Sequence, residues 1–173
     1  MTELRDEIAA RLETAFAARG MSEPGVAALR EASGVSLRTL YRHFPSREAM
    51  VEAALERRHA RYLAHLFDGL PTEPVAALDA AVERVGAWMA GVGAQGCLFH
   101  AAVAADPDNE ALRALRARHK REVAERLAAA LGRPAATAGV MVLHEGLVHA
   151  YAIDGAAALD AARVLGRELI ARE

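Results

Sequence analysis

The stretch Leu29-Arg-Glu-Ala-Ser-Gly-Val-Ser-Leu-Arg-Thr-Leu-Tyr-Arg-His-Phe44, followed by Pro45-Ser-Arg-Glu48, decides the fold of this part of the chain. It predicts a short helix, a turn at Gly34 and a second short helix that stops before the proline. Glycine suits the turn because it adopts positive φ at little cost. Ser36 can cap the second helix by accepting a hydrogen bond from a free backbone N–H. Together these features indicate a helix-turn-helix.

The second of these helices has one apolar and one polar face. Leu40 and Phe44 are placed to pack against the first helix, whereas Arg38 and Arg42 lie four residues apart and share another face. A helix of this kind can enter a DNA major groove and contact phosphates. The alternative is a purely structural helix pair whose arginines are solvated.

The segment from Val35 to Glu48 resembles the recognition-helix segment of the TetR family of bacterial transcriptional regulators. Helical patterning before and after it is similar to that family along nearly all of the chain, although only residues 22–55 are motif-specific. The chain departs from the family pattern at Gly25, where a threonine is common, and at Arg30, where a small residue is usual. The resemblance implies a dimeric one-component regulator, a repressor, that binds a near-palindromic operator through residues 36–44 and is released by a small-molecule effector.

Eight residues are candidates for contact with double-stranded DNA. Arg38 is the candidate for reading guanine, because its guanidinium matches the O6 and N7 acceptors. Two further side chains lie close enough to the helix start to meet bases. The resemblance assigns phosphate contacts to three positions, and we expect one neighbouring threonine to act in the same way. The two side chains near the helix start are Ser36 and Leu37. The three phosphate positions are Tyr41, His43 and Arg47, and the neighbouring threonine is Thr39. Arg42 is the eighth candidate.

Composition supports a globular helical protein. Of 173 residues, 53% are apolar and 25% are charged, and the net charge is −2. Positive charge is instead local, since residues 30–47 hold four arginines and one glutamate. Cys97 is the only cysteine, which excludes an intrachain disulfide. No apolar run approaches the about 18 residues of a membrane span, and the first residues lack a signal core, so we expect a cytoplasmic protein without a membrane partner.

Apolar residues recurring at helical spacing predict an all-α fold of about nine helices. Residues 1–45 are expected to form a three-helix, helix-turn-helix DNA-binding domain, and residues 46–70 a long connecting helix. The segment Gly69-Leu-Pro-Thr-Glu-Pro74 breaks the pattern. Residues 71–173 are expected to form a helical ligand-binding and dimerisation domain, which closes with two helices at about 135–153 and 156–172.

Two groups of residues in this C-terminal part are candidates for binding. Each glycine inside a helix costs about 1 kcal/mol relative to alanine, so close approach of another helix is a plausible reason for keeping it. In the family the last two helices pair with those of a second copy, which makes Gly139, Gly146 and Ala150 candidates for a homodimer interface. The alternative is an intrachain contact. Large or mixed-polarity side chains that could line an effector pocket are Trp88, Met89, Phe99, His100, Met141 and His144.

Other functions are weaker interpretations. His144 and His149 superficially resemble a zinc-protease motif, but a five-residue step leaves them about 140° apart on a regular helix. We therefore expect no metal, no cofactor and no catalytic residue, and keep a helical metal-dependent enzyme only as a distant alternative. Cys97 near a helix start could sense oxidants, although a small buried side chain is the simpler interpretation. A DNA-binding architectural or adaptor protein of the same fold, without an effector, is the nearer alternative.

Overall fold

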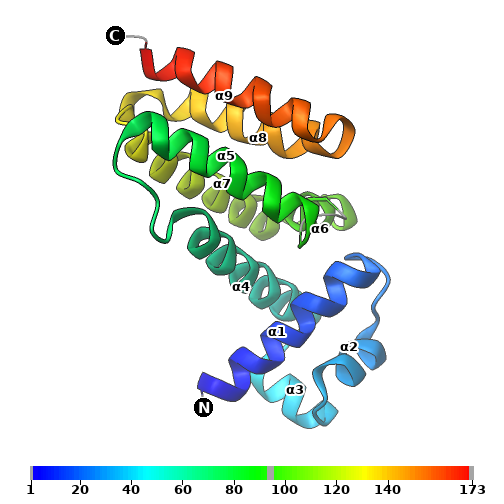
Figure 1. Cartoon of the computed structure of the whole chain (residues 1–173). Coiled ribbons are helices and arrows are strands. Elements are labelled where there is room, and N and C mark those ends of the chain that lie inside the picture. The colour runs from blue at the N-terminus through cyan, green and yellow to red at the C-terminus, as the bar shows by residue number, and fades with distance from the viewer. Residues whose placement is uncertain (1, 93–95, 172–173) are drawn as a thin grey trace. The chain divides into compact units, whose positions relative to one another are not determined.

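The computed structural model describes residues 2–92 and 96–171, which form nine α-helices, one short 3₁₀ helix and no strand (Figure 1). For the part of the chain described, the predicted all-α fold is confirmed. The α-helices are α1 (Thr2–Arg19), α2 (Val26–Ser33), α3 (Leu37–His43), α4 (Arg47–Phe67), α5 (Pro74–Ala90), α6 (Leu98–Ala105), α7 (Glu110–Ala130), α8 (Thr137–Asp154) and α9 (Ala156–Ala171), and the 3₁₀ helix η1 is Pro134–Ala136.

The described residues group into two compact units. The first comprises those of 1–61 and 97–116, and the second those of 62–96 and 117–173. Each of α4 and α7 therefore contributes residues to both units. The grouping puts α6 in the same unit as the helix-turn-helix. The prediction of three functional domains, at 1–45, 46–70 and 71–173, concerns roles in binding and is not tested by this grouping.

An apolar cluster holds α1, α2 and α3 together in the first unit. Leu12 and Phe16 lie four residues apart on one face of α1, and both are fully buried. Leu29 of α2 and Leu40 of α3 are fully buried in the same cluster. Burial of a leucine side chain contributes about 2 kcal/mol, so these positions provide much of the stability of the module.

The turn between α2 and α3 depends on Gly34. Its φ is +69°, in the left-handed region, and its N–H donates to the carbonyl of Glu31 at 3.1 Å. Arg11 of α1 reaches the same turn, where its Nη1 donates to the carbonyl of Ser33 at 2.9 Å. The end of α2 is thus tied to α1, and the direction in which α3 leaves the turn is set by a glycine and one arginine.

The second unit has its own core, in which α5, α8 and α9 pack against one another. A β-carbon built at Gly166 of α9 would lie 2.4 Å from Cδ1 of Leu78 on α5, closer than atoms can approach. Arg167 of α9 also forms an ion pair with Asp79 of α5 at 3.0 Å. The small residue therefore lets α9 lie close against α5.

Glycine and capping residues mark several helix ends. Gly34 ends α2 and Gly155 ends α8, as predicted from the glycines. Glu73 supplies a cap that the sequence did not indicate: its two carboxylate oxygens accept from the N–H groups of Val75 and Ala76, at 3.1 and 2.7 Å. Within the described ranges, no helix has the combination of length and apolar character that crossing a bilayer requires.

We expect Gly34→Ala to lower the free energy of unfolding more than Gly20→Ala does. Both glycines have positive φ, +69° and +81°, so strain of about 1–2 kcal/mol is common to the two variants. Only the new β-carbon at position 34 meets another atom, Arg11 Nη1 at 2.4 Å, so Arg11 must leave the Ser33 carbonyl. Urea unfolding of both variants measures the difference, and equal losses would show that Arg11 does not support the turn.

Candidate functional site

Helix α3 presents its polar side chains to solvent and its apolar ones to the core. Leu40 and the C-capping Phe44 are fully buried. Arg38 and Arg42 are exposed. Tyr41 and Leu37 are exposed as well, with exposed fractions of 39% and 44%. The structure thus brings together, on the outer side of one helix, four of the eight side chains predicted to contact DNA.

Ser36 and Thr39 are engaged with each other at the start of α3. The Thr39 N–H donates to Ser36 Oγ at 3.1 Å, and the two hydroxyl oxygens lie 2.9 Å apart. This is the predicted N-cap. No acidic residue occupies the first turn of α3, although the helix dipole would favour one there.

His43 and Arg47 have surroundings that sequence reasoning did not indicate. The His43 ring is half-buried, and its Nε2 is buried without a hydrogen-bond partner among the described residues. Arg47 Nη2 donates to the carbonyl of Met21, and its Cζ lies 5.9 Å from the centre of the Phe16 ring. Arg47 thus has a structural contact of its own, and its predicted phosphate contact is not tested.

A buried carboxylate links α1 to α4 within the first unit, and sequence reasoning missed it. Glu13 is buried, and its Oε1 lies 2.6 Å from Arg61 Nη1 and 3.7 Å from Arg58 Nη1, while Arg57 Nε lies 3.7 Å from Oε2. Burial lowers the pKa of Arg58, and the charge of Glu13 opposes that shift. The available signal was the position of Glu13, four residues after buried Ala9 on the apolar stripe of α1.

In the second unit, two of the predicted pocket residues, Trp88 and His144, both contact Tyr62 of α4. The Tyr62 hydroxyl lies 2.6 Å from Nε2 of buried His144, and the Tyr62 and Trp88 rings meet edge to face with centres 5.0 Å apart. His144 Nδ1 lies 3.1 Å from Oε1 of Glu145, which Lys120 Nζ approaches to 2.8 Å. Because a carboxylate only accepts, His144 Nδ1 donates to it.

The other four predicted pocket residues have separate surroundings. Met89 is buried in the core of the second unit, and Met141 is half-buried on α8. Phe99 and His100 belong to the first unit, where Phe99 is buried and meets the edge of His59 with ring centres 6.4 Å apart. A single pocket formed by all six residues is therefore not tested by the geometry within either unit.

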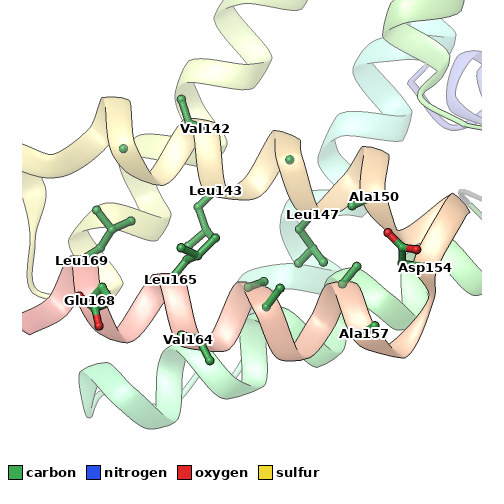
Figure 2. A pocket seen from close by; sticks show the side chains of 15 residues that line it. Val142, Leu143, Leu147, Ala150, Asp154, Ala157, Val164, Leu165, Glu168 and Leu169 are labelled. Atoms are coloured by element: carbon green, nitrogen blue, oxygen red, sulfur yellow. The ribbon is translucent and has the colours of Figure 1, made fainter.

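An apolar groove of about 900 Å³ runs along α8 and α9 (Figure 2). It contains all three predicted dimer residues, Gly139, Gly146 and Ala150. Figure 2 shows other large side chains of the groove, of which Val142, Val164 and Leu165 are exposed by 74%, 59% and 58%. An exposed apolar surface on two neighbouring helices is typical of a protein–protein contact.

The two groove glycines differ in their surroundings. A β-carbon at Gly139 would lie 3.1 Å from Leu169 Cδ2, so the intrachain explanation weighed for a helical glycine applies there. A β-carbon at Gly146 would meet nothing within 4 Å. The described residues therefore give no steric reason for glycine at position 146.

The weaker interpretations find little support in the described residues. No group of three or more His, Cys, Asp or Glu residues there could hold a metal ion. His144 is buried whereas His149 is exposed, with Nδ1 2.7 Å from the carbonyl oxygen of Glu145, as their five-residue spacing predicts. Cys97 is the N-cap residue of α6 and packs, half-buried, against the core of the first unit.

Residues 8–54 match the family model described as bacterial regulatory proteins, tetR family. The matched segment covers most of α1, all of α2 and α3, and the start of α4, which together form the helix-turn-helix and its core. The N-terminal segment of the chain is therefore similar to the helix-turn-helix of TetR-family bacterial regulatory proteins. This match supports the prediction of a DNA-binding transcriptional regulator rather than an enzyme.

Solved structures with this fold cover nearly the whole chain. A putative TetR-family transcriptional regulator from Rhodococcus sp. has a TM-score of 0.80 and 24% identity, over 98% of this chain and 100% of that one. A TetR-family transcriptional regulator from Streptomyces coelicolor has a TM-score of 0.75 and 21% identity, over 98% and 95%. GusR of Salmonella enterica has a TM-score of 0.71 and 23% identity, over 96% and 95%. Comparison with curated proteins gives no match. At these identities the solved structures show the fold alone.

We expect the Glu145 carboxylate to stabilise the protein above pH 4.5 and to lose this effect as the pH falls towards 2. Burial tends to raise its pKa, but the hydrogen bond with His144 and the charge and hydrogen bond of Lys120 outweigh burial and lower the pKa from 4.5 to about 2. The unfolded chain therefore takes up its proton first as the pH falls. Glu145→Gln should cost up to about 3 kcal/mol at neutral pH and progressively less below pH 4.5.

Urea unfolding at a series of pH values measures this difference. Glu125→Gln, which changes an exposed carboxylate of α7, is the matched control and should show a smaller dependence on pH. A loss at Glu145→Gln that is the same at every pH would contradict the ion-pair explanation.

Proposed function

We propose that the protein is a homodimeric repressor that binds a near-palindromic operator through residues 36–44 and releases it when a small-molecule effector binds. One observation carries the proposal: α3 of a TetR-family helix-turn-helix exposes Leu37, Arg38, Tyr41 and Arg42 on its outer side. The proposed site of action is the cytoplasm, and the proposed partners are double-stranded DNA, a second copy of the chain and an effector.

Each exposed side chain of α3 has a proposed role. Arg38 lies in the first turn of the helix, where a recognition helix meets base edges, and reads guanine through its two parallel N–H groups. Arg42, one turn later, and Tyr41 contact phosphates, which position the helix without reading sequence. The proposed phosphate contacts of Thr39, His43 and Arg47 involve side chains that are half-buried in the free protein.

The groove on α8 and α9 supports the proposed homodimer. Val142, Val164 and Leu165 are apolar and exposed, and a second copy of the same face would remove them from water. Gly146 lies in this groove, and a β-carbon added there would meet no described atom within 4 Å, so close approach of a partner helix explains why a glycine is present. A two-fold dimer would place two recognition helices on symmetric half-sites, which a near-palindromic operator requires.

A series of side-chain contacts that starts at Tyr62 and ends at Lys120, through His144 and Glu145, supports the proposed effector response. Helix α4 starts directly after the helix-turn-helix and carries Tyr62, whose hydroxyl lies 2.6 Å from His144 of α8. A ligand that breaks this hydrogen bond would change the contacts of α4 in the second unit. If the ligand binds more tightly to a state in which the recognition helices no longer match the operator, ligand binding weakens DNA binding. DNA binding then weakens ligand binding by the same free energy, typically about 1–3 kcal/mol.

The alternatives differ from this proposal in a measurable way. An architectural or adaptor protein of the same fold would bind DNA with no small molecule that releases it. A thermal-shift screen for ligands, followed by operator binding with each stabilising compound, separates that alternative from the proposed repressor. The other alternative, a helical metal-dependent enzyme, is not supported by the family match and would require stoichiometric zinc together with hydrolytic activity.

We expect Arg38→Ala to weaken operator binding by about 1–3 kcal/mol and to relax the preference for one base in each half-site. Arg42→Ala should instead weaken binding to all sequences alike and flatten its dependence on salt, because it removes a phosphate contact. Competition between operator and random duplexes at several salt concentrations measures both effects. An unchanged operator preference in Arg38→Ala would move base reading to another residue.

We expect Gly146→Leu to dissociate the homodimer without unfolding the subunit. The position has open space within the chain, so the larger side chain acts only where a partner helix approaches. Ala152→Leu is the matched control, because Ala152 is an exposed residue of α8 that does not line the groove. Sedimentation velocity measures the oligomeric state, and a dimer that persists in Gly146→Leu would place the interface elsewhere.

A further inference from the structure

Leu37 is an exposed leucine at the first position of the recognition helix, and its place needs an explanation. Its side chain is exposed by 44%, whereas the other leucine of α3, Leu40, is fully buried. Tyr41 lies one turn after Leu37 and is also exposed, by 39%. The two form an apolar stripe beside the cationic stripe of Arg38 and Arg42.

Leu37 is not buried by the fold as Leu40 is. It is absent from the core cluster that holds Leu29, Leu40 and Phe44. The N-cap is provided by Ser36, and a helix start would be more stable with an acidic residue than with an apolar one. A leucine at this position therefore fits an apolar group on a partner.

Major-groove chemistry narrows that partner to one group. A base edge there presents donors and acceptors, which leucine cannot bond, and a single apolar group, the C5-methyl of thymine.

Resting on the proposed operator binding, we propose that Leu37 contacts the C5-methyl group of a pyrimidine, thymine in the natural operator, and thereby contributes to sequence specificity. Leu37 and Arg38 are consecutive and point about 100° apart around the helix, so they meet different base pairs. The half-site then has a thymine close to the guanine that Arg38 reads. The exposed ring of Tyr41 lies one turn further along the same stripe and borders the contact.

The test uses duplexes that the full-length protein selects from a random-sequence pool, resynthesised with deoxyuridine in place of each thymidine in turn. Uracil differs from thymine only by the missing methyl group. Wild-type protein should bind about three- to fivefold more weakly at one substituted position in each half-site, the value of one methyl group removed from water. At that position 5-methylcytosine should bind more tightly than cytosine, because it carries the same C5-methyl.

Two variants show whether Leu37 makes the contact. Leu37→Ala should bind the thymine and uracil duplexes with nearly equal affinity, and because Leu37 is exposed the variant should unfold like the wild type. Arg38→Ala is the matched control, which should lose guanine preference yet keep the ratio between thymine and uracil. Wild-type binding that ignores every thymine-to-uracil change, or a ratio that survives in Leu37→Ala, would overturn the inference while leaving operator binding intact. A chain that selects no duplex at all would overturn the proposed function as well.

Discussion

The left-handed turn at Gly34, tied to α1 by Arg11, is the constraint on which the rest of the recognition surface depends. A glycine lets the backbone reverse within a few residues, and the Arg11 hydrogen bond to Ser33 holds the end of α2. With that direction set, burial of Leu40 and Phe44 leaves only one rotation of α3 that satisfies the core. The side chains left outside are the ones that can meet DNA, so the fold decides the content of the interface.

The positions of individual charges say more about DNA binding in this protein than its net charge does. The chain carries a net charge of −2, and several of its arginines are engaged within the fold, among them Arg58 with Glu13 and Arg47 with the Met21 carbonyl. Arg38 and Arg42 differ because they stand on the outer side of α3. Among residues 30–47, Arg47 therefore differs from Arg38 and Arg42, because its guanidinium already donates to a carbonyl of the fold.

The second unit combines a polar interior with an apolar surface. Inside, the chain of contacts from Tyr62 through His144 to Glu145 keeps a charged carboxylate paired with Lys120. Outside, α8 and α9 expose aliphatic side chains along a groove, the reverse of what a solitary helical unit would place in water. A buried polar network is stable only when each of its groups has a hydrogen-bond partner. An apolar surface can bind any partner of complementary shape. These features suit the proposed regulated unit that pairs with its own copy.

Local features of the sequence were sufficient to predict the helices, the turn at Gly34, the Ser36 cap and the division of α3 into two faces, because each depends on residues close in the chain. They could not predict that Glu13 forms ion pairs with arginines of α4 or that Arg47 lies over the Phe16 ring. Nor could they predict that Tyr62 contacts His144, 82 residues later in the sequence. Such contacts join side chains that only packing brings together. The same holds for Gly146: a glycine inside a helix predicts a close neighbour, and only the tertiary structure reveals that the described residues supply none.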